Sequence, residues 1–122
     1  MPRARRSNCP VACSLDVLGD RWTLLVIRDL LAGKRRYAEF LASAEAIPTN
    51  ILAERLKRLE QEGLIQRVRY SQRPPRDEYR LTAEGERLGA VLEAMATWGT
   101  HHFPGTRRRD LQTASDSRML DS

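Results

Sequence analysis

The clearest pattern along this 122-residue chain is a set of apolar residues at helical spacing near its centre. Leu52, Leu56 and Leu59 recur at that spacing, so they form one stripe along a helix. Pro48 sets where this helix begins, because the residue before a proline is pushed out of the α region. We therefore expect a helix that starts with Pro48 as its first residue or with Thr49 as its N-cap.

A different period follows this helix. After Gly63, residues 64–70 place β-branched and aromatic residues in partial alternation with charges, which is typical of a strand. Residues 77–81 can pair back with that strand to form a hairpin. The intervening residues 71–76 contain two consecutive prolines, which a central strand does not accept, so we expect an exposed loop there.

Shorter helices precede this unit and a longer one follows it. Asp20 is placed to cap the second helix, and Gly33 suits its end. The helices expected from start and stop signals cover residues 10–18, 21–31 and 37–42, with a last one from the cap residue Thr82 to about Trp98. Within the second helix the expected core residues are Trp22, Leu25, Val26 and Leu30.

The order of a short helix, a connector over residues 43–47, a second helix and a charged hairpin is that of a winged helix-turn-helix. The expected fold class is therefore mainly α with a small β-hairpin wing (α+β), flanked by N- and C-terminal helices that serve dimerisation. The expected division is a flexible basic arm over residues 1–8, one domain over residues 9–103 and a disordered tail over residues 104–122.

No membrane segment or export signal is expected. The chain has no run of about 18 apolar residues that could span a bilayer. Residues 1–8 are basic, as at the start of a secretory signal, but Ser14 and Asp16 interrupt the apolar stretch that follows. The expectation is a soluble, cytoplasmic protein without a membrane partner.

The polar face of the central helix suits the major groove of double-stranded DNA. Asn can make two hydrogen bonds to an adenine edge, Lys and Arg can reach guanine or phosphate, and small residues can approach a thymine methyl group. A solvated face is the simpler explanation for one helix alone, but the neighbouring turn and hairpin favour DNA. The expected DNA-reading residues are Thr49, Asn50, Ala53, Glu54, Arg55, Lys57 and Arg58.

Charge is concentrated on the same segment. The whole chain has a net charge of +5, and residues 34–80 hold 11 basic against 7 acidic residues, a net charge of +4. Binding to the phosphate backbone should therefore weaken as salt concentration rises. The expected wing contacts are Gln72, Arg73 and Arg76, and the expected backbone contacts are Arg35 and Arg36.

The last expected helix carries a continuous apolar stripe, which either packs on its own domain or forms a dimer interface. We expect the interface, because this helix follows the wing at the edge of a small domain and ends in a bulky aromatic residue. A two-fold dimer would present two recognition helices to one face of DNA. The expected interface residues are Val11, Leu15, Leu88, Val91, Leu92, Met95 and Trp98.

Several separated motifs follow one another in a characteristic order: Cys9-Pro10-Val11-Ala12, Leu18 to Leu25, Arg28-Asp29-Leu30, Ile47 to Leu52, Arg55-Leu56, Leu59-Glu60, Pro74-Pro75, Tyr79 and Leu81-Thr82. Together they resemble the HxlR-type family of winged helix-turn-helix bacterial transcriptional regulators, which is related in fold to the MarR-like regulators. The resemblance covers about residues 9–99. It implies a homodimer that binds inverted-repeat operators and represses or activates nearby genes. At Ala38 the chain departs from the small polar residue more usual there.

Cys9 is the candidate for redox control. It lies at or near a helix N-cap, where the helix dipole and nearby arginines favour the thiolate form. Family members with a cysteine at this position include sensors of oxidants and electrophiles, so the resemblance implies thiol modification or an intersubunit disulfide. The alternative is a structural cysteine, as for Cys13, which lies one turn further on and is expected in the core.

Other classes of function lack their residue patterns. His101 and His102 with two distant cysteines do not reproduce a zinc spacing, and they are expected beyond the last helix; no metal and no cofactor is expected. No nucleophile with a base, carboxylate pair or phosphate-binding glycine loop is visible, so an enzyme is not expected. Two alternatives stay open: a regulator gated by an unknown small-molecule effector, and a winged-helix protein-interaction module.

Overall fold

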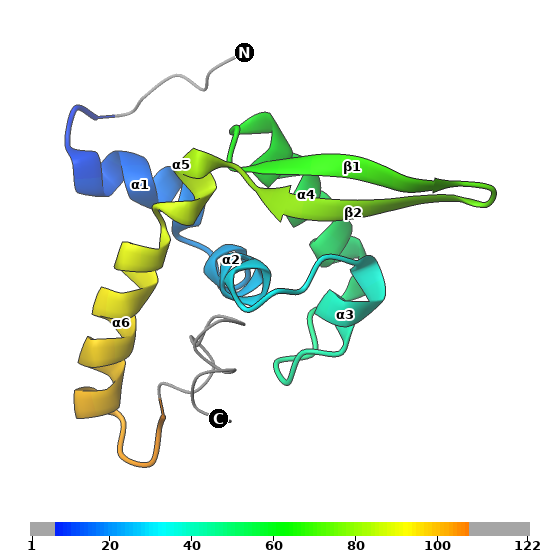
Figure 1. Ribbon diagram of the computed structural model, residues 1–122. Helices are drawn as coiled ribbons and strands as arrows, with labels where there is room; N and C mark the ends of the chain where they lie inside the picture. Colours follow the sequence, from blue (N-terminus) through cyan, green and yellow to red (C-terminus); the bar gives the residue numbers. More distant parts are fainter. Residues whose placement is uncertain (1–6, 108–122) are drawn as a thin grey trace.

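The computed structural model describes residues 7–107. Residues 1–6 of the expected arm and residues 108–122 of the expected tail lie outside the described residues. In chain order the elements are α1 (Pro10–Leu18), α2 (Thr23–Leu31), α3 (Tyr37–Leu41), α4 (Thr49–Gln61), β1 (Ile65–Gln72), β2 (Pro75–Leu81), α5 (Ala83–Glu86) and α6 (Gly89–His102) (Figure 1).

Helix α2 forms the centre of the fold. Its start is fixed by Asp20, whose Oδ2 accepts hydrogen bonds from the backbone N–H groups of Trp22 (3.0 Å) and Thr23 (3.2 Å). The helix therefore begins two residues later than expected, at Thr23. Trp22 and Leu25 are only half-buried, whereas Ile27, which the sequence pattern did not single out, is fully buried. The other buried apolar residues are Val26, Leu30, Phe40, Ile47, Leu52, Leu56, Leu59, Ile65 and Leu92.

The hairpin is longer than expected. Antiparallel pairing runs from Ile65 opposite Leu81 to Gln72 opposite Pro75, so the expected loop over residues 71–76 is reduced to a turn at Arg73 and Pro74, and residues 72–76 are exposed as expected. A two-stranded sheet has only edge strands, and an edge position tolerates the missing N–H of proline, which explains how Pro75 enters β2. The hairpin projects well beyond the helices (Figure 1).

The expected last helix is divided into α5 and α6. Thr82 is confirmed as the cap of α5, since its side chain accepts a hydrogen bond from the backbone N–H of Gly85. A Cβ added at Gly85 would lie 2.0 Å from the carbonyl oxygen of Leu64, so only glycine allows α5 to approach the start of β1 so closely. Helix α6 then turns away and extends to His102, so both histidines lie inside the helix rather than beyond it.

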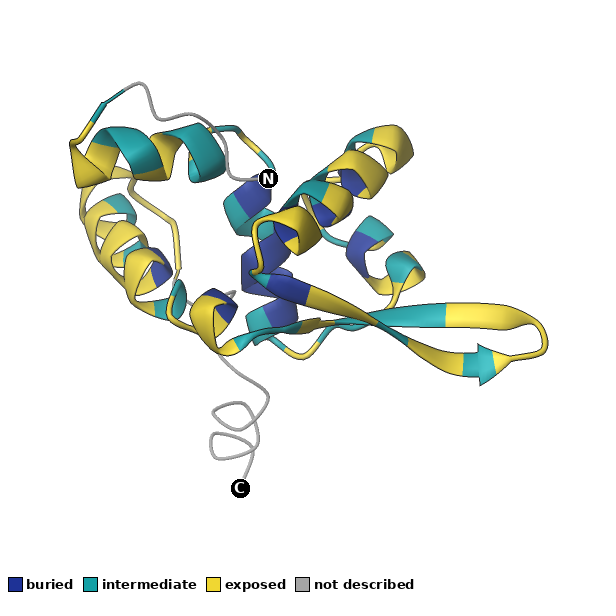
Figure 2. Cartoon of the chain, turned by 90° about the horizontal axis from the view of Figure 1, so that it is seen from above, coloured by how far each residue is buried: buried dark blue, intermediate teal, exposed yellow. Residues whose placement is uncertain are grey.

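The fold class is confirmed as mainly α with a small β-hairpin wing. The hairpin lies at one end of the molecule and α1 and α6 lie at the other, as two perpendicular views agree (Figures 1 and 2). No helix in residues 7–107 is long and apolar enough to cross a membrane.

Candidate nucleic-acid interface

Helices α3 and α4 form the helix-turn-helix. Glu39 caps α3 by accepting hydrogen bonds from the backbone N–H groups of Arg35 (2.9 Å) and Arg36 (2.8 Å), and these bonds lower the pKa of Glu39. Ala38 has no polar side chain that could cap α3, and Glu39 accepts the hydrogen bonds at the start of this helix instead. In the connector, Ala46 has a φ of 57°, a left-handed conformation that turns the chain toward α4.

Two contacts set the position of α4. The hydroxyl of Tyr37 donates a 2.7 Å hydrogen bond to the carbonyl oxygen of Thr49. The apolar stripe predicted for this helix is buried against the rest of the core. Pro48 occupies the N-cap and Thr49 is the first helical residue, so the start of α4 falls between the two expected alternatives.

The side of α4 opposite its buried stripe faces outward (Figure 2). Five of the seven expected DNA-reading residues are exposed there, and Glu54 also contacts the guanidinium of the next residue. This face offers a neutral amide, a hydroxyl, a methyl group and one cation, which are groups that can meet base edges and phosphates. The five exposed residues are Thr49, Asn50, Ala53, Glu54 and Lys57.

The other two expected DNA-reading residues, Arg55 and Arg58, are half-buried and make contacts inside the protein. Arg55 Nε donates to Asp20 Oδ2 at 2.7 Å. Arg58 Nη2 donates to the carbonyl oxygens of Asp16 (2.9 Å) and Val17 (3.2 Å). The guanidinium groups of both arginines are therefore engaged at the end of α1 and just before α2, and their expected contacts with DNA stay a prediction.

The wing separates paired from unpaired cations. Nearer its base, arginines pair with acidic neighbours, as in Arg69 with Asp77 at 3.2 Å. At the tip, Gln72, Arg73 and Arg76 are exposed, and no ion pair involves either arginine within residues 7–107. The two tip arginines thus remain available for an external anion such as a phosphate.

The two expected backbone contacts behave differently. Arg35 Nη1 donates to the carbonyl oxygens of Leu30 (2.8 Å) and Lys34 (2.9 Å), so this nitrogen is bound within the fold, and the contact of Arg35 with DNA stays a prediction. Arg36 is exposed, and its guanidinium carbon lies 4.1 Å from the centre of the Tyr70 ring. This cation–π contact joins the start of α3 to strand β1.

A second backbone contact supports that junction. The N–H of Tyr79 in β2 donates a 2.7 Å hydrogen bond to the carbonyl oxygen of Arg35. The wing is therefore held against the residues that precede α3 by its main chain at Tyr79 and by the contact of Arg36 with Tyr70. This contact and the Tyr37 bond connect the wing, α3 and the start of α4 in one series.

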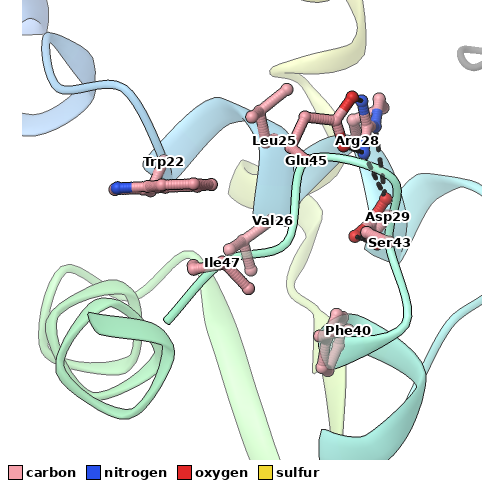
Figure 3. A pocket seen from close by; sticks show the side chains of 9 residues that line it. All are labelled: Trp22, Leu25, Val26, Arg28, Asp29, Phe40, Ser43, Glu45 and Ile47. Atoms are coloured by element: carbon pink, nitrogen blue, oxygen red, sulfur yellow. Dashed lines mark hydrogen bonds and ion pairs between the residues drawn. The ribbon is translucent and has the colours of Figure 1, made fainter. Parts of the chain in front are cut away.

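Sequence reasoning missed a polar cluster in which only Arg28 and Asp29 are buried (Figure 3). Arg28 of α2 donates to Glu45 of the connector at 2.7 Å and to Asp29 at 2.9 Å. The Ser43 hydroxyl bonds Asp29, and Lys34 Nζ donates to Ser43 Oγ at 2.7 Å. The bond to Glu45 raises the pKa of Arg28, and the bond from Arg28 lowers the pKa of Glu45. The available signal was an adjacent Arg and Asp inside an otherwise apolar helix.

The expected dimer surface is mostly open. Val11 is 67% exposed, Leu15 55%, Met95 53% and Trp98 62%. Together with α2, helices α1 and α6 enclose an apolar groove of about 680 Å³. Leu92 is corrected, because at 7% exposure it belongs to the core of its own domain. Val91 is also exposed and Leu88 is half-buried.

The two cysteines differ in environment. Cys9 is exposed at the N-cap of α1. Cys13 is half-buried, not in the core as expected, and its Sγ donates to the carbonyl oxygen of Ser7 at 3.2 Å. Both are free thiols, so the more accessible sulfur is that of Cys9.

Comparisons with known proteins agree with this geometry. The uncharacterized HTH-type transcriptional regulator Rv3095 of Mycobacterium tuberculosis is 42% identical over 94 residues, covering 77% of this chain. The chain spans only 59% of the length of Rv3095. The uncharacterized HTH-type transcriptional regulator YtcD of Bacillus subtilis is 33% identical over 99 residues, with 81% of this chain and 79% of YtcD covered.

Solved structures of regulators share the fold. The oxidized form of the redox regulator HypR matches with a TM-score of 0.69 and 35% identity, covering 76% of this chain and 96% of HypR. The reduced transcriptional regulator YodB of Bacillus subtilis matches with a TM-score of 0.67 and 32% identity, covering 83% of this chain and all of YodB. Residues 17–107 match the family described as HxlR-like helix-turn-helix. The chain therefore belongs to the HxlR-like helix-turn-helix family, and the relatives named above are transcriptional regulators.

Proposed function

We propose that this protein is a sequence-specific regulator that binds double-stranded DNA as a homodimer on an inverted-repeat operator. The observation that carries the proposal is the separation of charges on the helix-turn-helix and wing. Lys57, Arg73 and Arg76 are exposed and form no ion pair within the described chain, whereas neighbouring arginines are paired internally. Free cations beside a helix that carries Asn50 and Thr49 suit phosphate and base contacts.

The homodimer is supported by the apolar surface of α1 and α6. Large apolar side chains that are half or more exposed are costly in water, and here they flank a groove that is itself apolar. Phe103, at 52% exposure, extends this surface beyond α6, where Trp98 also stacks on His102 with ring centres 4.6 Å apart. A two-fold axis near this surface would place two wings and two α4 helices on one side.

Control by thiol chemistry at Cys9 is the regulatory part of the proposal. An exposed thiol at the start of α1 is open to oxidants and electrophiles. It also directly precedes α1, which carries two of the proposed interface residues, Val11 and Leu15. The likeness to HypR and YodB, whose structures include oxidized and diamide-treated forms, supports this choice over a structural cysteine.

The experiment is selection of operators from random duplexes, followed by footprinting of the selected sequence. The expected result is an inverted repeat whose half-site centres are about 34 Å apart, or a multiple of this spacing, because adjacent turns of the major groove repeat at that distance. Selection of single asymmetric half-sites by a monomer would reject the dimer. The absence of any selected duplex would reject DNA reading altogether.

A further inference from the structure

Arg55 and Arg58 extend from α4 toward the same corner of the fold, where α1 ends and α2 begins. They lie three residues apart, so both side chains emerge on one side of the helix. Arg55 reaches Asp20, which precedes α2, and Arg58 reaches the carbonyl oxygens of Asp16 and Val17. Side-chain hydrogen bonds thus join α4 to both N-terminal helices.

Arg58 supplies the positive charge that the last turn of α1 lacks. The last carbonyls of a helix have no partner inside it and form the negative end of the helix dipole. The last turn of α1 contains no basic residue, so no cation of its own balances these carbonyls. The two bonds from Arg58 Nη2 fill this role, and Arg58 Nε is buried without a partner in the described part of the chain. Bonding to α1 therefore leaves Arg58 Nε without contact with water.

Arg55 binds a carboxylate that already has a structural task. Asp20 accepts hydrogen bonds from two backbone N–H groups at the start of α2 and from the Thr23 hydroxyl. Burial raises the pKa of Asp20, but the bonds from Thr23 and Arg55 outweigh burial and hold that pKa below its usual range. Asp20 is thus charged at neutral pH, and the Arg55 side chain beside it is only 17% exposed.

Contact with DNA would require both arginines to leave these partners. Without Arg55, the half-buried Asp20 carboxylate would lose its cation, and without Arg58 the carbonyl oxygens of Asp16 and Val17 would lose these two hydrogen bonds. Lys57 lies between the two arginines in sequence, but it is exposed and has no ion pair in residues 7–107. It is the matched cation that remains free on the same helix.

We infer that Arg55 and Arg58 are positioning residues for DNA recognition, which fix α4 on the corner between α1 and α2 and touch no DNA. The inference rests on the proposed function, because it takes α4 as the DNA-reading helix. Since Cys9 occupies the N-cap of α1 and α1 carries part of the proposed dimer surface, Arg58 links that segment directly to α4.

The test measures operator affinity as a function of salt for Arg58→Met, Arg58→Lys and the control Lys57→Met. For Lys57→Met the log–log salt slope should become shallower by about 0.9, as for one lost phosphate contact. Arg58→Met should lower operator affinity by about tenfold, which is the effect expected from the loss of hydrogen bonds made by a charged group. The salt slope and the ranking of operator variants should stay unchanged. Arg58→Lys can still donate to the carbonyls of α1 and should recover most of the affinity.

A second measurement uses the protein without DNA. Hydrogen exchange of backbone amides in the last turn of α1 should accelerate in Arg58→Met and stay at the wild-type rate in Lys57→Met. If Arg58→Met melts below the assay temperature, Arg58→Gln keeps one donor and takes its place. A salt slope in the Arg58 variant as shallow as that of Lys57→Met, or unchanged exchange in α1, would overturn the inference. If the wild-type protein selects no duplex, the proposed function is rejected. The hydrogen-exchange result for α1 does not depend on that outcome, because it is measured without DNA.

Discussion

The hydroxyl of Tyr37 and the carbonyl oxygen of Thr49, 2.7 Å apart, connect the first helix of the helix-turn-helix to the first residue of the second. The Tyr37 ring also packs against the hydrophobic core. The hydroxyl is thus the one group of this side chain that acts directly on the start of α4, where the proposed base contacts lie.

Replacing Tyr37 by Phe keeps the ring and removes only this bond. We expect a loss of about 0.5–1.5 kcal/mol in the free energy of unfolding, the usual net contribution of one hydrogen bond, measured by urea denaturation. Operator affinity should fall as well, because the start of α4 loses a fixed partner. Tyr70→Phe is the control, since its ring contact with Arg36 survives. Equal stability and affinity in Tyr37→Phe and wild type would show that the bond has no positioning role.

Asn50 and Arg73 should differ in what they contribute to DNA binding. If Asn50 reads a base, Asn50→Ala should reduce discrimination at one operator position by about 1–3 kcal/mol. If Arg73 holds a phosphate, Arg73→Ala should weaken all sequences similarly and make the salt slope shallower. Binding to a panel of single-substituted operators separates the two results. A uniform loss from both variants would sink the assignment.

The proposed interface can be tested by introducing charge into the exposed apolar surface. Met95→Glu combined with Trp98→Glu should give monomers and abolish tight operator binding, because one half-site supplies too few contacts. Thr100→Glu is the matched control, since Thr100 is exposed on another side of α6. Light scattering that still reported a dimer for the double variant would show that the interface lies elsewhere.

Cys9 should react before Cys13. Its sulfur is exposed, whereas that of Cys13 is half-buried and bonded to Ser7, so Cys9 should alkylate faster at neutral pH, as mass spectrometry of quenched samples would show. Mild oxidant should change operator affinity in wild type but not in Cys9→Ser. The same oxidant response in both proteins would make Cys9 structural.

Acid should destabilise the fold through its bonded carboxylates. Hydrogen bonds lower the pKa of Glu45, whose ordinary value is 4.5, and also the pKa of Glu39. A carboxyl group with a lowered folded pKa adds stability above its unfolded pKa, and that stability is lost as pH falls through the folded value. Urea midpoints should therefore decline steadily from about pH 5 downward.

Glu45→Gln isolates part of this dependence. The variant loses the charged partner of Arg28, so it should be less stable than wild type at neutral pH and should lose less stability on acidification. Glu60→Gln, on the exposed surface of α4, serves as the control. Parallel pH profiles for wild type and Glu45→Gln would contradict a role for the cluster in acid stability.

The elements that sequence predicted best are those with local signals. The stripe of leucines defined α4, Pro48 bounded its start, and Thr82 marked the cap of the next helix. The close approach of Gly85 to the backbone of Leu64 has no such signal. That approach is set by the packing of distant segments.

The same distinction holds for the candidate site. A helical wheel places Arg55 and Arg58 beside the polar face of α4, but it cannot show that Asp20 and the end of α1 lie within reach. Leu92 was misassigned for a related reason, because an apolar stripe wide enough for an interface also covers positions that pack on α2. Burial and long-range partners decide between these roles.

The dependence of α1 on Arg58 has a consequence for the order of folding. A helix of nine residues with none buried is too short to be stable alone in water. Arg58, which donates to the carbonyl oxygen of Asp16 at the end of α1, lies 42 positions further along the chain. This contact can therefore form only when α4 is already present. During synthesis α1 emerges first, yet it should acquire stable structure only after α4 has formed. The segment that carries Cys9 would therefore be among the last parts of the described chain to become ordered.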